Sequence, residues 1–282
     1  MEIMFSGFSG QIREDLLFQH QITHYSLDGA FHRHEGYELY LFLQGNVNCY
    51  VEQQCFHMEP GDLLVIRPGQ YHRPVMLDRT AYERITLNFR EALLQKLSTG
   101  QTDLTASFRN TSADKACLIH LTGEQLQHYL SLASKIESFL SSDDFGADLL
   151  IQSYLTQLFV FINRVLRTAG APSANIMPKL IRDLLRYIDT HLSETITLET
   201  LEREFYLNGT YISRQFKKHT GLTLRNYLPE RRISYACTLL ATDLSITEVC
   251  HRCGFSDYAN FIRTFTKTMG ISPGKYAKQQ KQ

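Results

Sequence analysis

Side chains that could bind a metal ion or a small polar molecule lie close together in the first part of the chain. His32, His34 and Glu38 follow the spacing His-x-His-x3-Glu, and His72 follows a Pro-Gly turn further along. On a strand, His32 and His34 would share a face because side chains repeat every second residue. Imidazole nitrogens and a carboxylate suit iron, manganese, nickel or zinc. The four side chains therefore indicate either a metal site or a polar pocket.

Short β-strands are predicted to position these residues. The segments 37–50 and 63–66 are apolar and separated by Gly/Pro turns, a pattern typical of a sandwich or jelly-roll barrel. The strings around the histidines resemble the two cupin motifs, which here read His32-x-His34-x3-Glu38-x6-Gly45 and Gly61-x6-Pro68-Gly69-x2-His72. The resemblance implies a cupin-like domain over residues 1–115. In metal-dependent cupins the equivalent residues bind one metal, and here they would be His32, His34, Glu38 and His72.

The last hundred residues contain one pattern twice. From Ile212 onward its positions recur with a shift of 49 residues, as Arg214 and Arg263 illustrate, and upstream of the turn the shift is 48, as Thr197 and Ser245 illustrate. Each copy reads as a short capped helix, a turn and a second amphipathic helix, which is a helix-turn-helix. Two such units in tandem predict a protein that reads duplex DNA. The repeated pairs are Ile212 and Phe261, Arg214 and Arg263, Phe216 and Phe265, Lys218 and Lys267, Gly221 and Gly270, Thr223 and Ser272, and Tyr227 and Tyr276.

The second helix of each unit is predicted to be a recognition helix, starting near Asn208 in the first unit and near Ser256 or Asp257 in the second. Its apolar residues are four apart and share one face. The other face carries polar groups and an Arg, which can reach base edges in the major groove. The predicted DNA-contacting residues are Thr210, Ser213, Arg214 and Lys217 in the first unit, and Tyr258, Ala259 and Arg263 in the second.

The second unit closely resembles the signature of AraC/XylS-type transcription regulators, with the strings Ser245-Ile246-Thr247-Glu248-Val249, Cys253-Gly254-Phe255-Ser256-Asp257 and Gly270-Ile271-Ser272-Pro273. The resemblance implies a DNA-binding domain at 178–282. Its two helix-turn-helix motifs, at about 198–219 and 246–268, would be joined by a long helix. The chain departs from the family at Glu202 and Cys250, where Ala is usual.

Several interpretations of the barrel stay open. AraC-type regulators often keep a similar histidine string without metal, and Met76 stands where the second cupin motif has Asn. We therefore expect no cofactor and a small-molecule effector, for which a sugar is a candidate, with a divalent metal as the less favoured ligand. The barrel could also belong to a metal-dependent cupin enzyme fused to DNA-binding helices, or serve only as the dimerisation scaffold of a constitutive activator. The predicted effector pocket is His32, His34, Glu38, Tyr40 and His72, with Arg67 as a further candidate.

The middle of the chain is predicted to be a helical hairpin over 116–170, with helices at 123–141 and 146–168. The second helix repeats apolar residues at three- and four-residue steps, a stripe wide enough to serve more than one partner. We expect this stripe to pack partly on the barrel and partly against a second subunit, giving a homodimer. Residues 171–177 would be the interdomain linker. The stripe consists of Ile151, Tyr154, Leu155, Leu158, Ile162, Val165 and Leu166.

Charge is divided unevenly along the chain. Lys and Arg total 29, as do Asp and Glu, but residues 176–282 hold 16 basic against 10 acidic side chains. That half is therefore +6, and the remaining 13 basic and 19 acidic residues make the rest −6. A basic C-terminal half suits double-stranded DNA as partner.

Composition bounds the class of protein. Without a signal-like start or a run of 18 apolar residues, we expect a cytoplasmic protein with no membrane partner. The six cysteines show no framework of disulfides, and the pair Cys250 and Cys253 lacks the second pair that a zinc site needs. We expect that pair to be packing residues.

The expected fold class is α+β. A cupin-like β-barrel is followed by two helices and then by an all-α domain with two helix-turn-helix units. The protein is expected to be a DNA-binding transcription regulator rather than an enzyme. RNA polymerase would be a further partner if it activates transcription.

Overall fold

The computed structural model describes residues 16–24, 32–110, 117–168 and 176–280. The chain divides into two compact units that meet between Met177 and Pro178. The predicted linker, 171–177, lies outside the described residues except for its last two positions.

The first unit contains two antiparallel sheets. The five-stranded sheet has the order β1-β7-β2-β5-β8, and the three-stranded sheet has the order β4-β3-β6. This is the predicted arrangement of short antiparallel strands separated by turns. The strands are β1 (Leu16–Thr23), β2 (Tyr37–Gln44), β3 (Val47–Val51), β4 (Gln54–His57), β5 (Asp62–Ile66), β6 (His72–Met76), β7 (Tyr82–Phe89) and β8 (Cys117–His120).

Strand β2 separates two hydrophobic cores because its side chains alternate between the faces of the sheet. Leu39 and Leu41 are fully buried in the core that faces the helices. Tyr40 and Phe42 are buried between the two sheets, in the barrel core. Glu38 has the same parity as Tyr40, so β2 directs a carboxylate into the barrel.

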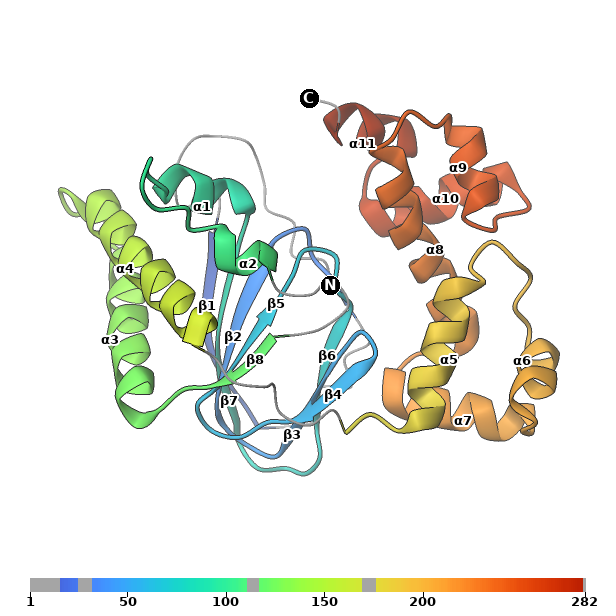
Figure 1. The fold of residues 1–282 in the computed structure, drawn as a ribbon, viewed down its shortest axis with the longest axis horizontal. Coiled ribbons are helices and arrows are strands. Elements are labelled where there is room, and N and C mark those ends of the chain that lie inside the picture. Colours follow the sequence, from blue (N-terminus) through green and yellow to red (C-terminus); the bar gives the residue numbers. More distant parts are fainter. Residues whose placement is uncertain (1–15, 25–31, 111–116, 169–175, 281–282) are drawn as a thin grey trace. The chain divides into compact units, whose positions relative to one another are not determined.

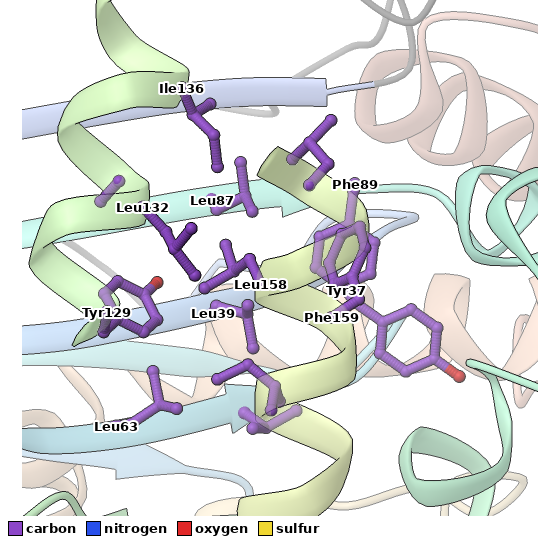
Figure 2. Packing of buried hydrophobic residues seen from close by; sticks show 14 of the residues in the cluster. Tyr37, Leu39, Leu63, Leu87, Phe89, Tyr129, Leu132, Ile136, Leu158 and Phe159 are labelled. Carbon is purple, nitrogen blue, oxygen red and sulfur yellow. The ribbon is translucent and has the colours of Figure 1, made fainter. Parts of the chain in front are cut away.

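Two long helices, α3 (Gly123–Leu140) and α4 (Ala147–Thr168), lie along the outer face of the five-stranded sheet (Figure 1). Figure 2 shows their side chains packed against the strands, with Leu158 and Phe159 beside Leu39 and Phe89. Two short helices, α1 (Glu91–Leu97) and α2 (Ala106–Asn110), adjoin the same core. Thr122 forms a capping box with Gln125 at the start of α3.

The segment 116–170, predicted as a helical hairpin for dimerisation, is not a unit separate from the barrel. It begins with β8, which pairs with β5 in the main sheet. Most of the apolar stripe expected at a dimer interface is buried inside the domain. Ile151, Leu155 and Ile162 are 0% exposed in the core that faces the helices, and Leu158 is 1% exposed.

Helix α4, with 22 residues, is long and apolar enough to cross a membrane by length and composition alone. Its structure indicates a core helix instead. One face is buried on the sheet, while exposed Ser153, Gln157 and Arg164 share the other face. A membrane-spanning helix would place such polar side chains in lipid.

The second unit is all-helical, and its order matches the predicted pair of helix-turn-helix motifs. The first motif is α6 (Leu198–Phe205) with α7 (Gly209–Thr220), and the second is α9 (Ile246–Arg252) with α10 (Tyr258–Met269). Helix α8 (Leu224–Leu240) joins them (Figure 1). Helices α5 (Lys179–Thr190) and α11 (Pro273–Gln280) complete the unit.

The sequence repeat is also a structural repeat. Gly221 and Gly270 end the two recognition helices with φ of 75° and 70°, in the left-handed region that glycine adopts readily. After each glycine, a tyrosine of the following helix packs against a phenylalanine of the recognition helix. The ring centroids are 5.2 Å apart for Phe216 and Tyr227, and 5.6 Å apart for Phe265 and Tyr276.

Candidate DNA-binding surface and barrel site

Side-chain caps fix the start of both recognition helices. Asn208 Oδ1 accepts a hydrogen bond from the Thr210 N–H at the start of α7, and Asp257 caps α10 through the Asn260 N–H. Such caps satisfy backbone donors that a helix start leaves open. Ser245 and Glu248 form the predicted capping box on α9.

The predicted contact residues lie on the outer faces of these helices. Ile212 and Phe216 of α7, like Phe261 and Phe265 of α10, are buried, which turns the opposite faces to solvent. Ser213 is half-buried, and the other predicted residues are exposed, namely Thr210, Arg214, Lys217, Tyr258, Ala259 and Arg263.

Two exposed residues on these faces were not predicted. Tyr211 is 41% exposed, and the Arg214 guanidinium carbon lies 6.0 Å from the centre of its ring. Asn260 is exposed at the equivalent place in α10. Both lie three residues before the arginine of their helix, so helical spacing alone could have identified them.

The first motif has a glutamate side chain at its turn, and the second motif has none there. The Glu202 carboxylate accepts a hydrogen bond from the backbone N–H of Gly209, the first residue of α7. A Cβ on Gly209 would lie 2.8 Å from Glu202 Oε1. The departure from the family at Glu202 is therefore coupled to a glycine at the start of the recognition helix.

Arg232 of α8 ties the second motif to the loop that follows α5. Its guanidinium donates hydrogen bonds to the carbonyls of Leu192, at 3.0 Å, and Glu194, at 2.6 Å. It also lies 5.9 Å from the Phe255 ring centre. Burial lowers the pKa of Arg232 from its ordinary value.

The CxxC pair consists of packing residues, as expected. Cys250 and Cys253 are 0% exposed in the core formed by α8, α9 and α10. Both are free thiols, and burial raises the pKa of Cys253 to about 12.

In the barrel, three of the four predicted ligands converge. His34, Glu38 and His72 place one ligand atom each within 4.8 Å of the others, and all three are buried. His34 Nε2 lies 2.7 Å from Glu38 Oε2, and His72 Nε2 lies 3.5 Å from the same oxygen. Burial alone would raise the pKa of Glu38, but the adjacent His34 and His72 hold it well below its usual range.

Backbone carbonyls orient both histidines. The Nδ1 of His34 lies 2.8 Å from the Gly36 carbonyl oxygen, and the Nδ1 of His72 lies 3.0 Å from that of Gln70. A carbonyl only accepts, so each Nδ1 must carry a hydrogen. The Nε2 atoms then face Glu38.

His32 does not join this group. The HxH spacing suggested that His32 lies on a regular strand, but it forms only an isolated β-bridge with His72. Its ring lies edge-on against the His72 ring, with centroids 4.2 Å apart. His32 thus packs against His72. The shared strand face predicted for His32 and His34 does not form because His34 lies in the loop before β2.

Tyr40 is also in the barrel, where its hydroxyl is hydrogen-bonded to that of Tyr82. Arg67 is not. Its guanidinium donates to the carbonyls of Phe108 and Arg109 at the end of α2. Arg67 follows Ile66, whose side chain lies in the barrel core, so strand alternation directs Arg67 to the other face and its pocket assignment was wrong.

Strand β7 adds a polar residue that sequence reasoning missed. Asn88 pairs in register with Glu38 of β2, is 1% exposed, and its Oδ1 makes no hydrogen bond within the described part of the chain. No motif marks it, because cross-strand pairing brings it to the site.

Comparisons with known proteins agree with both halves of this description. The AraC-like ligand binding domain family matches residues 15–159, and the helix-turn-helix domain family matches residues 201–279. The chain belongs to the AraC family of transcription regulators.

Relatives match the chain to different extents. YijO of Escherichia coli, an uncharacterised HTH-type transcriptional regulator, is 34% identical over 134 residues, 47% of this chain and 46% of YijO. The chain thus spans less than half the length of that relative. The transcriptional activator RhaR of an Enterobacter species is 25% identical over 245 residues, 86% of this chain and 85% of RhaR.

Among solved structures, the C-terminal domain of the response regulator AraT from Geobacillus stearothermophilus is 30% identical. The match covers 37% of this chain and 88% of the AraT domain, with a TM-score of 0.36.

Proposed function

We propose that this protein binds specific operator DNA through α7 and α10 and regulates transcription in response to an effector in its barrel. The observation that carries the proposal is the repeat itself. Two capped helices of equal length present Arg214 and Arg263 to solvent at equivalent positions. An exposed arginine on such a helix can donate two hydrogen bonds to guanine in the major groove.

The two helices would read different bases. In α7 the exposed face offers Thr210, Tyr211 and Lys217, while α10 offers Tyr258, Ala259 and Asn260. Because these sets differ, the binding site of one chain should be asymmetric. In a tandem arrangement the helices would enter successive major-groove segments about 34 Å apart.

The effector would bind in the barrel, near His34, Glu38 and His72, with Tyr40 and His32 beside them. Buried polar groups of this kind are retained where they bind something, since burying them costs free energy otherwise. An effector that binds one domain arrangement more tightly than another would shift the population between them.

A homodimer, a cytoplasmic location and, for an activator, a contact with RNA polymerase belong to the same proposal. Since most of the predicted stripe is buried, we place the dimer contact on other residues. Phe145, Leu149 and Leu150, at the α3–α4 turn, are 107%, 66% and 38% exposed. Large exposed apolar side chains in one place commonly mark protein interfaces. Sedimentation of the wild type and of Leu149→Asp would test this: a concentration-dependent dimer that the variant abolishes is expected.

The DNA-binding proposal is tested with Arg214→Ala and Arg263→Ala. Each should weaken binding to the selected operator by about 1–3 kcal/mol while leaving thermal stability unchanged, because a bidentate base contact contributes about that much. Arg203, an exposed arginine on α6, supplies the matched control. Unchanged operator affinity in both folded variants would remove these helices from the recognition role.

A further inference from the structure

Three polar atoms converge in the barrel, namely Nε2 of His34, Nε2 of His72 and Oε2 of Glu38. The Nδ1–H groups of His34 and His72 are held by the carbonyls of Gly36 and Gln70, so in the neutral rings both Nε2 atoms carry lone pairs. Both face Glu38 Oε2. Converging lone pairs and a negative carboxylate repel one another unless a cation lies among them.

That cation could be a proton on a histidine or a metal ion, and the geometry favours a metal. A proton on His34 would satisfy only the 2.7 Å contact and leave His72 Nε2, which makes no hydrogen bond within the described residues. Ligand atoms around a tetrahedral metal with bonds near 2.0–2.1 Å lie about 3.3 Å apart. The observed separations from Glu38 Oε2, 2.7 and 3.5 Å, lie on either side of that value.

The backbone carbonyls on Nδ1 strengthen this interpretation. A histidine that binds metal through one nitrogen usually donates its other N–H to a carbonyl or carboxylate, which fixes the tautomer. Both histidines of the group are held in this way.

Asn88 supplies a fourth donor atom. It stands directly across from Glu38 in the register of β2 and β7, where paired Cβ atoms lie about 5 Å apart. Its Oδ1 is buried without a hydrogen bond in the described structure. His32, by contrast, packs its ring against His72 and is not part of the convergent group.

We propose that His34, Glu38, His72 and Asn88 bind a divalent first-row transition-metal ion inside the barrel. The set of two imidazoles, a carboxylate and an amide oxygen suits zinc, iron, nickel or manganese. The metal is then the effector, or the part of the effector site that binds it. This step rests on the sensor role proposed above, whereas metal binding itself does not depend on DNA binding.

The test uses the full chain, stripped with a chelator and titrated with Zn²⁺ by calorimetry and with Co²⁺ by absorption. One equivalent should bind, the Co²⁺ spectrum should show ligand-field bands, and the melting temperature should rise with metal concentration. His72→Gln should lose binding. Asn88→Leu should weaken it at least about tenfold, while Asn88→Asp, which adds a charged oxygen donor, should tighten it.

His57→Gln is the matched control, since His57 is an exposed histidine that bonds Asn48 on β3. It should leave binding unchanged. Absence of saturable metal binding in the folded wild type overturns the proposal, as does binding that survives His72→Gln and Asn88→Leu undiminished. Binding at this site with no change in operator affinity supports the metal site but contradicts the sensor role.

Discussion

The Glu202 carboxylate lies over the first residue of the first recognition helix, where it accepts the backbone N–H of Gly209. A carboxylate at a helix N-terminus interacts favourably with the helix dipole. The same carboxylate occupies the space that a side chain on residue 209 would need. The second motif has Cys250 and Tyr258 at the corresponding positions. The two motifs therefore join their helices by different contacts.

Glu202 and Gly209 should be energetically coupled. Gly209→Ala alone should lower the free energy of unfolding by about 0.5–1.5 kcal/mol because its Cβ would displace the Glu202 carboxylate and break its hydrogen bond with the Gly209 N–H. In a Glu202→Ala background the same substitution should cost less, with a coupling energy of about 0.5–3 kcal/mol in urea unfolding. Gly274→Ala is the control. An added Cβ there would meet Ile246 Cδ1 at 3.4 Å, an ordinary contact distance, so its cost should be the same in both backgrounds. Equal costs in both backgrounds would contradict the coupling.

The turns of the two motifs should respond oppositely to substitution. Tyr206 and Gly254 hold equivalent places, with φ of 54° and 81°. Tyr206 is 93% exposed, so Tyr206→Gly should relieve backbone strain and stabilise the domain by about 0.5–1 kcal/mol.

Gly254→Ala should destabilise the same domain by more than about 1 kcal/mol, since its Cβ would lie 2.1 Å from the Leu192 carbonyl oxygen. Thermal unfolding of both variants measures the difference. A stabilising Gly254→Ala would show that this close approach is wrong.

The cysteines should divide by accessibility. Cys49, Cys55, Cys250 and Cys253 are buried, and burial raises the pKa of Cys55 and Cys253 to about 12. Since the thiolate is the reactive form, these thiols should resist a disulfide reagent at pH 8 in the folded protein. Only the half-buried Cys117 and Cys237 should react, and all six should react in urea. Rapid native reaction of Cys250 or Cys253 would argue against the packing role.

Lys217 should contribute to DNA binding without discriminating between sequences. It lies near the C-terminal end of α7 and is exposed. Lys217→Ala should weaken operator and unrelated DNA alike, and reduce the slope of log K against log salt by about 1, as expected for one lost phosphate contact. A loss confined to operator DNA would indicate a base contact instead.

The helical half of the fold was predictable because its signals are local. A cap such as Ser245 and a terminating glycine such as Gly270 act within a few residues of the helix they bound. The repeat then located both motifs. In the barrel, Glu38 could be identified from its motif, but Asn88 reaches it only through strand register, which sequence spacing does not reveal.

The sequence also does not reveal which surface an amphipathic helix packs against. The pattern on α4 correctly indicates a buried face, including Leu158, but periodicity does not say whether a sheet or a second subunit covers it. Arg67 shows the same limit, since its partners Phe108 and Arg109 lie some forty residues further along the chain.

We propose that one chain reads DNA with two different recognition helices. Its most direct test is selection of bound duplexes from a random library by the purified protein, repeated with Arg214→Ala and Arg263→Ala. The selected duplexes should contain an asymmetric site with two blocks of specified bases about one helical turn apart, and each variant should erase a different block. A short palindromic block per chain, or enrichment that both variants leave intact, would contradict it.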